Sequence, residues 1–138
     1  MSNYKDLALE DLEAAKALFQ FDMWNKVGRE CQQVCEKYIK HFLSSRHLLS
    51  NELERTHNLR KLFMAVPERD KDLSKDLVIV SNYYFETNYP GDNFIRLDKE
   101  MAEEAIKTAK AIIKYLDDFD VDKTAAQHNK LSSDPYSE

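Results

Sequence analysis

The sequence predicts an all-α protein, an antiparallel bundle of four main helices plus one short helix. The chain of 138 residues holds only two glycines and three prolines, which leaves long stretches without a helix breaker. Within those stretches apolar residues recur every three or four positions, the spacing that gathers them on one face of a helix. Such helices pack most simply as an antiparallel bundle, and this length suits one domain with one core.

Apolar stripes predict the first two helices. The first runs from about Asp6 to Phe21, and the second is longer and continues the same spacing after a short break. The first stripe consists of Ala8, Leu12, Ala15 and Phe19. The second consists of Val27, Cys31, Val34, Tyr38 and Phe42, and it is widened by Cys35 and Ile39.

A short third helix and a longer fourth helix follow. Thr56 can cap the third, which ends before Pro67 because proline disfavours the helical conformation in the preceding residue. The β-branched run 78–80 would also suit a strand, but the wider apolar period favours a fourth helix. The stripes are Leu59, Leu62 and Phe63 for the third helix, and Leu73, Leu77, Val80 and Tyr84 for the fourth.

Asp98 can cap a fifth helix, and polar residues dominate after it. We therefore expect the helical bundle to occupy residues 1–122 and a polar, disordered tail to occupy 123–138. The stripe of the fifth helix consists of Met101, Ala105, Thr108, Ile112, Leu116 and Phe119.

Composition excludes several classes of protein. The formal net charge of −5 opposes a general nucleic-acid footprint, so an RNA contact would need a local basic patch. No stretch approaches the roughly 20 apolar residues of a membrane span, and no apolar run follows a basic start. We expect no membrane contact, a cytoplasmic location and reduced thiols.

Both cysteines of the chain lie one helical turn apart on the apolar side of the second helix. Cys31 and Cys35 do not readily reach disulfide geometry at that spacing, and a zinc site would want two further ligands. His41 falls at the rim of the stripe and His47 beyond the helix. We interpret the cysteines as buried structural thiols and predict no metal site.

The other side of the second helix is polar. Its residues follow the i, i+3, i+4, i+7 pattern of a single helix face: Gln33, Glu36, Lys37 and Lys40. One interpretation is an exposed Glu36–Lys40 pair that contributes a few tenths of a kcal/mol. The other is a surface on which a partner or a phosphate docks.

Four blocks of the chain resemble the HEPN domains (higher eukaryotes and prokaryotes nucleotide-binding). The stretch CQQVCEKYIKHFL resembles their second-helix signature, and Cys31, Gln32, Gln33, Cys35, Glu36, Lys37 and Lys40 fall on it. THNLRKLF (56–63), YYFETNYPGDNF (83–94) and EAIKTAKAIIKYL (104–116) resemble three further family blocks in the same order. The resemblance spans residues 6 to 120.

The resemblance implies an all-α bundle that often pairs as a homodimer and often accompanies a minimal nucleotidyltransferase, as in toxin–antitoxin modules. Many HEPN proteins are ribonucleases with an Arg followed, after four to six residues, by a His. Imidazole can then shuttle the 2′-hydroxyl proton while guanidinium steadies the scissile phosphate.

The chain departs from that ribonuclease pattern. No arginine is followed by a histidine at the required spacing, Asn88 stands where the family has an arginine, and Arg55 lies too close to His57 for the family's arrangement. We therefore predict a non-catalytic module without a cofactor that binds a nucleotide, RNA or a protein partner, with a minimal nucleotidyltransferase as the expected partner. The alternative is a metal-independent ribonuclease toxin with an eroded motif. A third interpretation is a helical scaffold without a small ligand.

His57 and the turn at 88–92 complete the candidate surface. His57 is either a ligand or acid–base group, or a structural residue that hydrogen-bonds across its loop, which we favour. Pro90 and Gly91 supply turn chemistry. The tyrosines at 83, 84 and 89 could stack a base, although Tyr84 lies on the core stripe. The candidate ligand or partner surface consists of Gln33, Glu36, Lys37, Lys40, His57, Asn88 and Tyr89.

Apolar residues outside the main stripes predict self-association as a homodimer. They cluster between the first two helices and beside the turn after the fourth: Leu18, Phe21, Met23, Trp24, Phe85 and Phe94. A contiguous aromatic patch usually marks an interface, although Phe21 and Trp24 could instead fold back over the end of the bundle. In a dimer, Gln33, Lys37 and Asn88 would be candidates to line a groove between the subunits.

Overall fold

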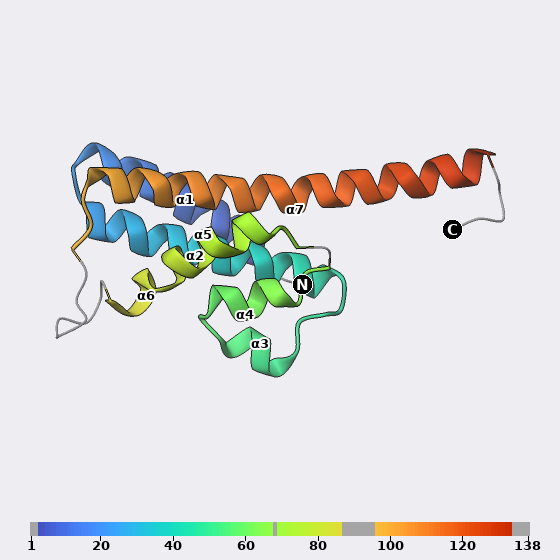
Figure 1. The fold of residues 1–138 in the computed structure, drawn as a ribbon, viewed down its shortest axis with the longest axis horizontal. Helices are drawn as coiled ribbons and strands as arrows, with labels where there is room; N and C mark the ends of the chain where they lie inside the picture. Colours follow the sequence, from blue (N-terminus) through green and yellow to red (C-terminus); the bar gives the residue numbers. More distant parts are fainter. Residues whose placement is uncertain (1–2, 68, 87–95, 134–138) are drawn as a thin grey trace.

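The computed structural model describes residues 3–67, 69–86 and 96–133, and for residues 85–86 and 120–133 it describes the backbone alone. Every regular element in these ranges is a helix, so the all-α prediction is confirmed (Figure 1). None of these helices combines the length and the hydropathy needed to span a bilayer. The helices are α1 (Tyr4–Gln20), α2 (Trp24–Ser45), α3 (Asn51–Arg55), α4 (Leu59–Met64), α5 (Lys71–Ser81), α6 (Tyr83–Glu86) and α7 (Lys99–Ser133).

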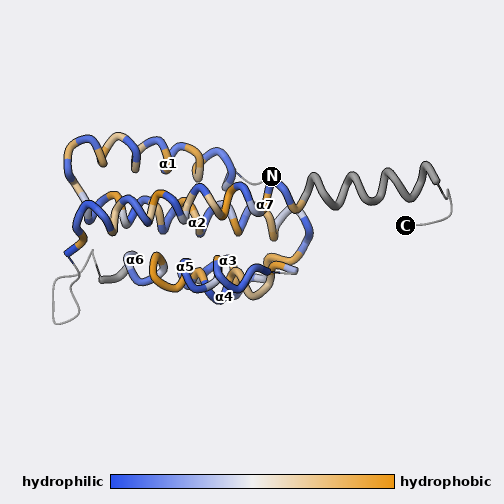
Figure 2. Tube along the Cα trace, turned by 45° about the horizontal axis from the view of Figure 1, so that its top comes forward, coloured by the Kyte–Doolittle hydropathy of each residue, from blue (hydrophilic) through white to orange (hydrophobic). Residues whose placement is uncertain are grey.

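Helix α2 is the centre of the bundle. The main helices α1, α2, α5 and α7 run in alternating directions along the chain, so α2 and α7 run the same way (Figure 1). Helix α1 lies on one side of α2 and α7, and the helices from α3 to α6 lie on the other side (Figure 2). Because α2 contacts α1, α4, α5, α6 and α7, residues all around it are buried, including polar ones.

The third predicted helix begins later than expected. Its N-cap is Asn58, whose side-chain oxygen accepts a hydrogen bond from the Lys61 amide at 3.1 Å. Thr56, the expected cap, instead accepts from the Asn58 amide at 3.2 Å. The sequence analysis also missed α3, which Ser50 caps, because this helix contains Leu53 as its one strongly apolar residue and has no stripe.

The predicted fourth helix is divided in two. Asp70 caps α5 by accepting from the Leu73 amide at 2.9 Å, but α5 ends at Ser81 and α6 begins at Tyr83. Beyond this break the core position falls to Tyr83, which is 4% exposed. Tyr84, the residue expected on the core stripe, is only partly buried.

Helix α7 begins as predicted and continues further than expected. Asp98 accepts a hydrogen bond from the Met101 amide at 2.8 Å, which confirms the cap. The helical backbone passes residue 122 and reaches Ser133, since no glycine or proline interrupts the sequence between Asp98 and Pro135. Residues 134–138 lie outside the described residues, and the division of the chain at residue 122 stays a prediction.

Close packing of Leu97 and Tyr83 on Gly28 of α2 fixes α6 and the start of α7 against that helix. A Cβ atom added to Gly28 would lie 2.5 Å from Leu97 Cδ2 and 3.1 Å from Tyr83 Cδ2, so a larger residue would force the buried Leu97 side chain to shift. Asn25 Oδ1 accepts a hydrogen bond from the Leu97 amide at 2.6 Å. Together these contacts hold Tyr83, and with it the neighbouring Tyr84, beside α2.

Candidate functional site

A buried ion pair lies on the polar face of α2. Lys40 Nζ is 2.8 Å from Glu36 Oε2, and the two residues are 4% and 5% exposed. The sequence pattern indicated an exposed pair. The pair is buried because α3 and the 56–58 connection cover that side of α2, and Lys40 Nζ also donates to the backbone oxygen of Glu54 at 2.6 Å. Such a pair holds one geometry, since leaving either charge alone in the interior is strongly unfavourable.

Gln32 extends the network, although the sequence analysis did not include it in the candidate surface. Its side chain is fully buried, and its Nε2 donates to Glu36 Oε1 at 3.1 Å and to the His57 backbone oxygen at 3.0 Å. Gln33, partly buried, donates from Nε2 to Gln32 Oε1 at 2.7 Å. The four-residue spacing of Gln32, Glu36 and Lys40 is the signal that places them on one helix face.

His57 joins this network to the protein surface. Its Nδ1 lies 3.0 Å from Glu36 Oε1, and 39% of its side chain is exposed. Its ring stacks on that of Tyr84 with centroids 4.3 Å apart and an interplanar angle of 18°. The sequence favoured a structural hydrogen bond of His57 across its loop, but the observed partner, Glu36, lies on α2 instead. Because a carboxylate orients it, the same imidazole also presents a defined edge to a ligand.

Arg29 lies beside the same aromatic pair, and sequence reasoning missed it. Its guanidinium carbon is 5.7 Å from the centroid of the Tyr84 ring, within the range of a cation–π contact. Its Nε atom is buried and meets no hydrogen-bond partner among the described residues. A buried donor without a partner is unfavourable, but Arg29 as a whole is only partly buried, so a ligand would meet the exposed part of its side chain. In the sequence only its position pointed to this site, because Arg29 lies four residues, about one helical turn, before Gln33.

The predicted surface residues therefore divide into three groups. Gln33, Glu36, Lys40 and His57 come together in the network. Lys37 lies apart, where its Nζ pairs with the Asp11 carboxylate of α1 at 2.6 Å. Asn88 and Tyr89 lie outside the described residues.

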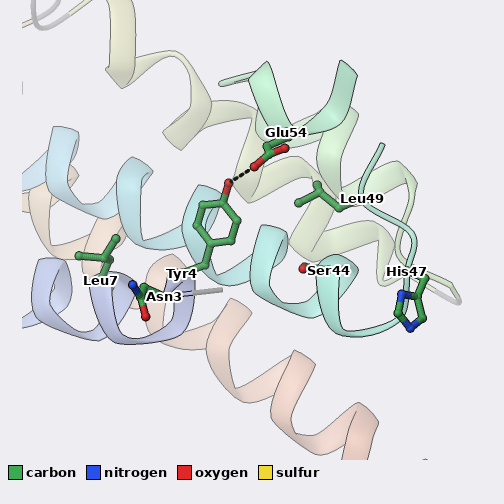
Figure 3. Close-up of a pocket in the computed structure, with 7 residues that line it drawn as sticks. All are labelled: Asn3, Tyr4, Leu7, Ser44, His47, Leu49 and Glu54. Atoms are coloured by element: carbon green, nitrogen blue, oxygen red, sulfur yellow. Dashed lines mark hydrogen bonds between the residues drawn. The ribbon is translucent and has the colours of Figure 1, made fainter. Parts of the chain in front are cut away.

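A separate hollow of about 680 Å³ lies between the start of α1, the end of α2 and Glu54 of α3 (Figure 3). In it the Tyr4 hydroxyl donates to Glu54 Oε2 at 3.0 Å. Burial, and next the neighbouring Glu54 carboxylate, raise the pKa of Tyr4 above its ordinary value. None of the predicted surface residues lines this hollow. Its lining consists of Asn3, Tyr4, Leu7, Ser44, His47, Leu49 and Glu54.

The cysteines belong to the core. Cys31 and Cys35 are both fully buried and free, as the stripe predicted. Burial raises the pKa of Cys31 to about 12 and that of Cys35 well above its ordinary value. Among the described residues, no group of three histidine, cysteine or acidic side chains is arranged to hold a metal ion.

Fold and site define an all-α bundle with a buried polar network on one face of its central helix, α2. The family model of the HEPN domain matches residues 1–119, and this chain belongs to the HEPN domain family. The resemblance of the four sequence blocks is thereby confirmed.

Two solved structures share the fold. TT1696 from Thermus thermophilus is 19% identical with a TM-score of 0.73, and the alignment covers 84% of this chain and 94% of that one. ST0689, an archaeal HEPN homologue, is 19% identical with a TM-score of 0.69, and the alignment covers 83% of this chain and 93% of that one. No curated protein matches this chain.

Proposed function

We propose that this chain is a non-catalytic HEPN module that binds a nucleotide where α2 meets His57 and Tyr84. The observation that carries the proposal is the guanidinium of the partly buried Arg29, which lies beside the stacked rings of His57 and Tyr84. Guanidinium groups bind phosphate through several N–H donors, and aromatic rings stack on bases. One cation and one aromatic platform therefore match the two chemically distinct ends of a nucleotide.

The buried network supports this function by fixing the site in advance. Glu36 is held by Lys40, Gln32 and His57, so the imidazole is oriented before a ligand arrives. Binding to groups that are already ordered loses less conformational entropy than binding to mobile ones. The net charge of −5 does not oppose this site, because the nearby cation acts on a single phosphate rather than on a long polyanion.

A ribonuclease remains the second candidate function, favoured by one observation. Glu36 orients His57, and Arg29 flanks the ring on which His57 stacks, so an arginine and a histidine approach one another without the family's sequence motif. We expect the purified protein not to cleave RNA in the presence of a metal chelator. Cleavage that persists under these conditions and disappears in His57→Ala would establish the ribonuclease instead.

The proposal includes protein partners and a cytoplasmic location. A minimal nucleotidyltransferase, in a toxin–antitoxin-like pair, is the partner that family membership suggests. Homodimer formation draws support from the turn between α1 and α2, where Phe21 and Met23 are 75% and 40% exposed. Trp24 is not part of this exposed surface, because it packs edge-on against Phe19 with ring centroids 5.0 Å apart.

Calorimetric titration of the full chain tests nucleotide binding. The ligands are the four ribonucleoside monophosphates and the matching nucleosides, which lack the phosphate. We expect at least one monophosphate to bind more tightly than its nucleoside. Arg29→Met should weaken that binding about tenfold, since a charged hydrogen bond contributes roughly 1.5 kcal/mol or more.

The matched control is Arg60→Met, which removes an exposed arginine from α4 and changes the net charge equally. Tyr84→Leu should weaken binding of the base while Arg60→Met leaves it unchanged. Absence of binding by every nucleotide, or equal effects of Arg29→Met and Arg60→Met, would overturn the proposal.

A further inference from the structure

Two open hollows lie between α5 and α7 and share Asp76, and together they are called the α5–α7 groove. One hollow, of about 110 Å³, lies toward the end of α5, and the other, of about 330 Å³, lies toward its start. The first is lined by Asp76, Ile79, Val80, Tyr83, Glu104, Ala105 and Thr108. The second is lined by Asp70, Leu73, Asp76, Ala111, Lys114, Tyr115 and Asp118.

The groove has an apolar lining that is partly open to solvent. Ile79 is 55% exposed, although it lies directly beside the buried Val80 and near Ala105 of α7. A large aliphatic side chain at the edge of a hollow is typical of a surface that buries further area on binding. The smaller hollow is well below the roughly 300 Å³ of typical ligand pockets, so it suits one side chain of a partner.

The walls of the groove are acidic. Asp76 belongs to both hollows, Glu104 adds a carboxylate to the smaller one, and Asp70 and Asp118 add theirs to the larger one. The one cation in the described lining, Lys114, pairs with Asp118 at 2.8 Å. Carboxylates therefore outnumber cations four to one in the described lining. This excess disfavours nucleic acid and also disfavours pairing of the groove with the same groove of a second copy.

The lining indicates the chemistry of the occupant. The two hollows follow the chain along α5, from Asp70 to Tyr83, so an occupant of both is elongated. The exposed side chain of Ile79 beside carboxylates suits a segment with apolar residues on one side and cations on its flanks, a pattern that an amphipathic helix presents. We propose that the α5–α7 groove is the docking site for a basic amphipathic helix of a protein partner.

This inference deepens the partner half of the proposed function and does not depend on nucleotide binding. The probe is a synthetic amphipathic helix with leucine at positions i, i+3 and i+7 and lysine on both flanks, labelled for fluorescence anisotropy. A scrambled peptide of the same composition measures non-specific attraction. We expect the helix to bind the full chain more tightly than the scrambled peptide, with an affinity that falls as salt rises.

Two matched pairs of variants locate the binding. Ile79→Ser should weaken binding about tenfold because it removes an apolar contact, whereas Val78→Ser, on the same helix but outside the hollows, should not. Glu104→Lys should weaken binding about fivefold, and Glu103→Lys, which changes net charge equally, much less. All four substitutions are at or near the surface, so circular dichroism should show unchanged folding.

Three results would overturn the docking site. The first is equal binding of the helical and the scrambled peptide, and the second is equal effects of the two variants within either pair. The third is a dimer in sedimentation that Ile79→Ser dissociates, because the groove would then be a contact between two copies of this chain. Calorimetric titration of Ile79→Ser with nucleotide separates the two proposals. Nucleotide affinity should be unchanged, so failure of the docking site and failure of the nucleotide site are distinguishable.

Discussion

Replacement of Lys40 by methionine is expected to destabilise the fold by about 3–5 kcal/mol, the range for breaking a buried ion pair from one side. Lys40 Nζ contacts Glu36 Oε2 at 2.8 Å and the Glu54 backbone oxygen at 2.6 Å. Methionine preserves most of the aliphatic volume but leaves the Glu36 carboxylate, 5% exposed, without its cation. The Glu54 carbonyl also loses a donor, so the expected loss lies toward the upper end of this range.

Urea denaturation followed by circular dichroism measures this loss as a change in the free energy of unfolding. The control is Lys16→Met on α1, where Lys16 pairs with Glu13 at 3.1 Å on the surface and the expected change is about 0.5 kcal/mol or less. The double variant Glu36→Gln/Lys40→Met should recover most of the loss, because it removes the isolated charge. A Lys40→Met protein as stable as the Lys16→Met protein would show that the buried Glu36–Lys40 pair is not essential to the stability of the fold.

Three further outcomes are expected. Cys31 and Cys35 should react slowly with a water-soluble thiol reagent, since both are buried and the pKa of Cys31 is raised to about 12; rapid labelling of the folded protein would contradict their core position. Burial, and next the Asp11 carboxylate, raise the pKa of Glu30 above its ordinary value of 4.5, so ionisation of Glu30 destabilises the fold. This destabilisation is absent below the pKa of Glu30 in the unfolded chain and complete above its pKa in the folded protein. Glu30→Gln should therefore have a larger free energy of unfolding than the parent at pH 7 and an equal one at pH 3. A gain at both pH values would disprove the raised pKa of Glu30. In sedimentation the protein should form a homodimer at micromolar concentration that Phe21→Ser weakens; a 16.2 kDa species unchanged by concentration would exclude the dimer.

The long helices could be predicted from the sequence because their apolar stripes are periodic over several turns. The cap at Asp98 and the burial of Cys31 and Cys35 followed from the same local patterns. Helix α3 could not be predicted, because its five residues contain one strongly apolar side chain and its start depends on the Ser50 cap. A helix of that length has too little pattern to show a period.

The candidate site was only partly predictable for a related reason. The face of α2 that carries Glu36 and Lys40 has the composition of an exposed face, and its burial depends on coverage by α3 and the connection at 56–58. The contact of Arg29 with Tyr84 joins residues far apart in the chain, and it depends on the break between α5 and α6 that turns Tyr84 away from the core. Local periodicity contains no information about either contact.

Nuclear magnetic resonance of the full chain, titrated with a monophosphate that binds, tests the central claim that α2, His57 and Tyr84 form the nucleotide site. Amide resonances should shift at Arg29, Gln33, His57 and Tyr84 and remain constant around the Tyr4–Glu54 hollow. The same titration of Arg29→Met should need a higher nucleotide concentration for equal shifts. Resonance shifts centred on Tyr4 and His47, or no shift near Arg29 at saturation, would show that the nucleotide does not bind at α2, His57 and Tyr84.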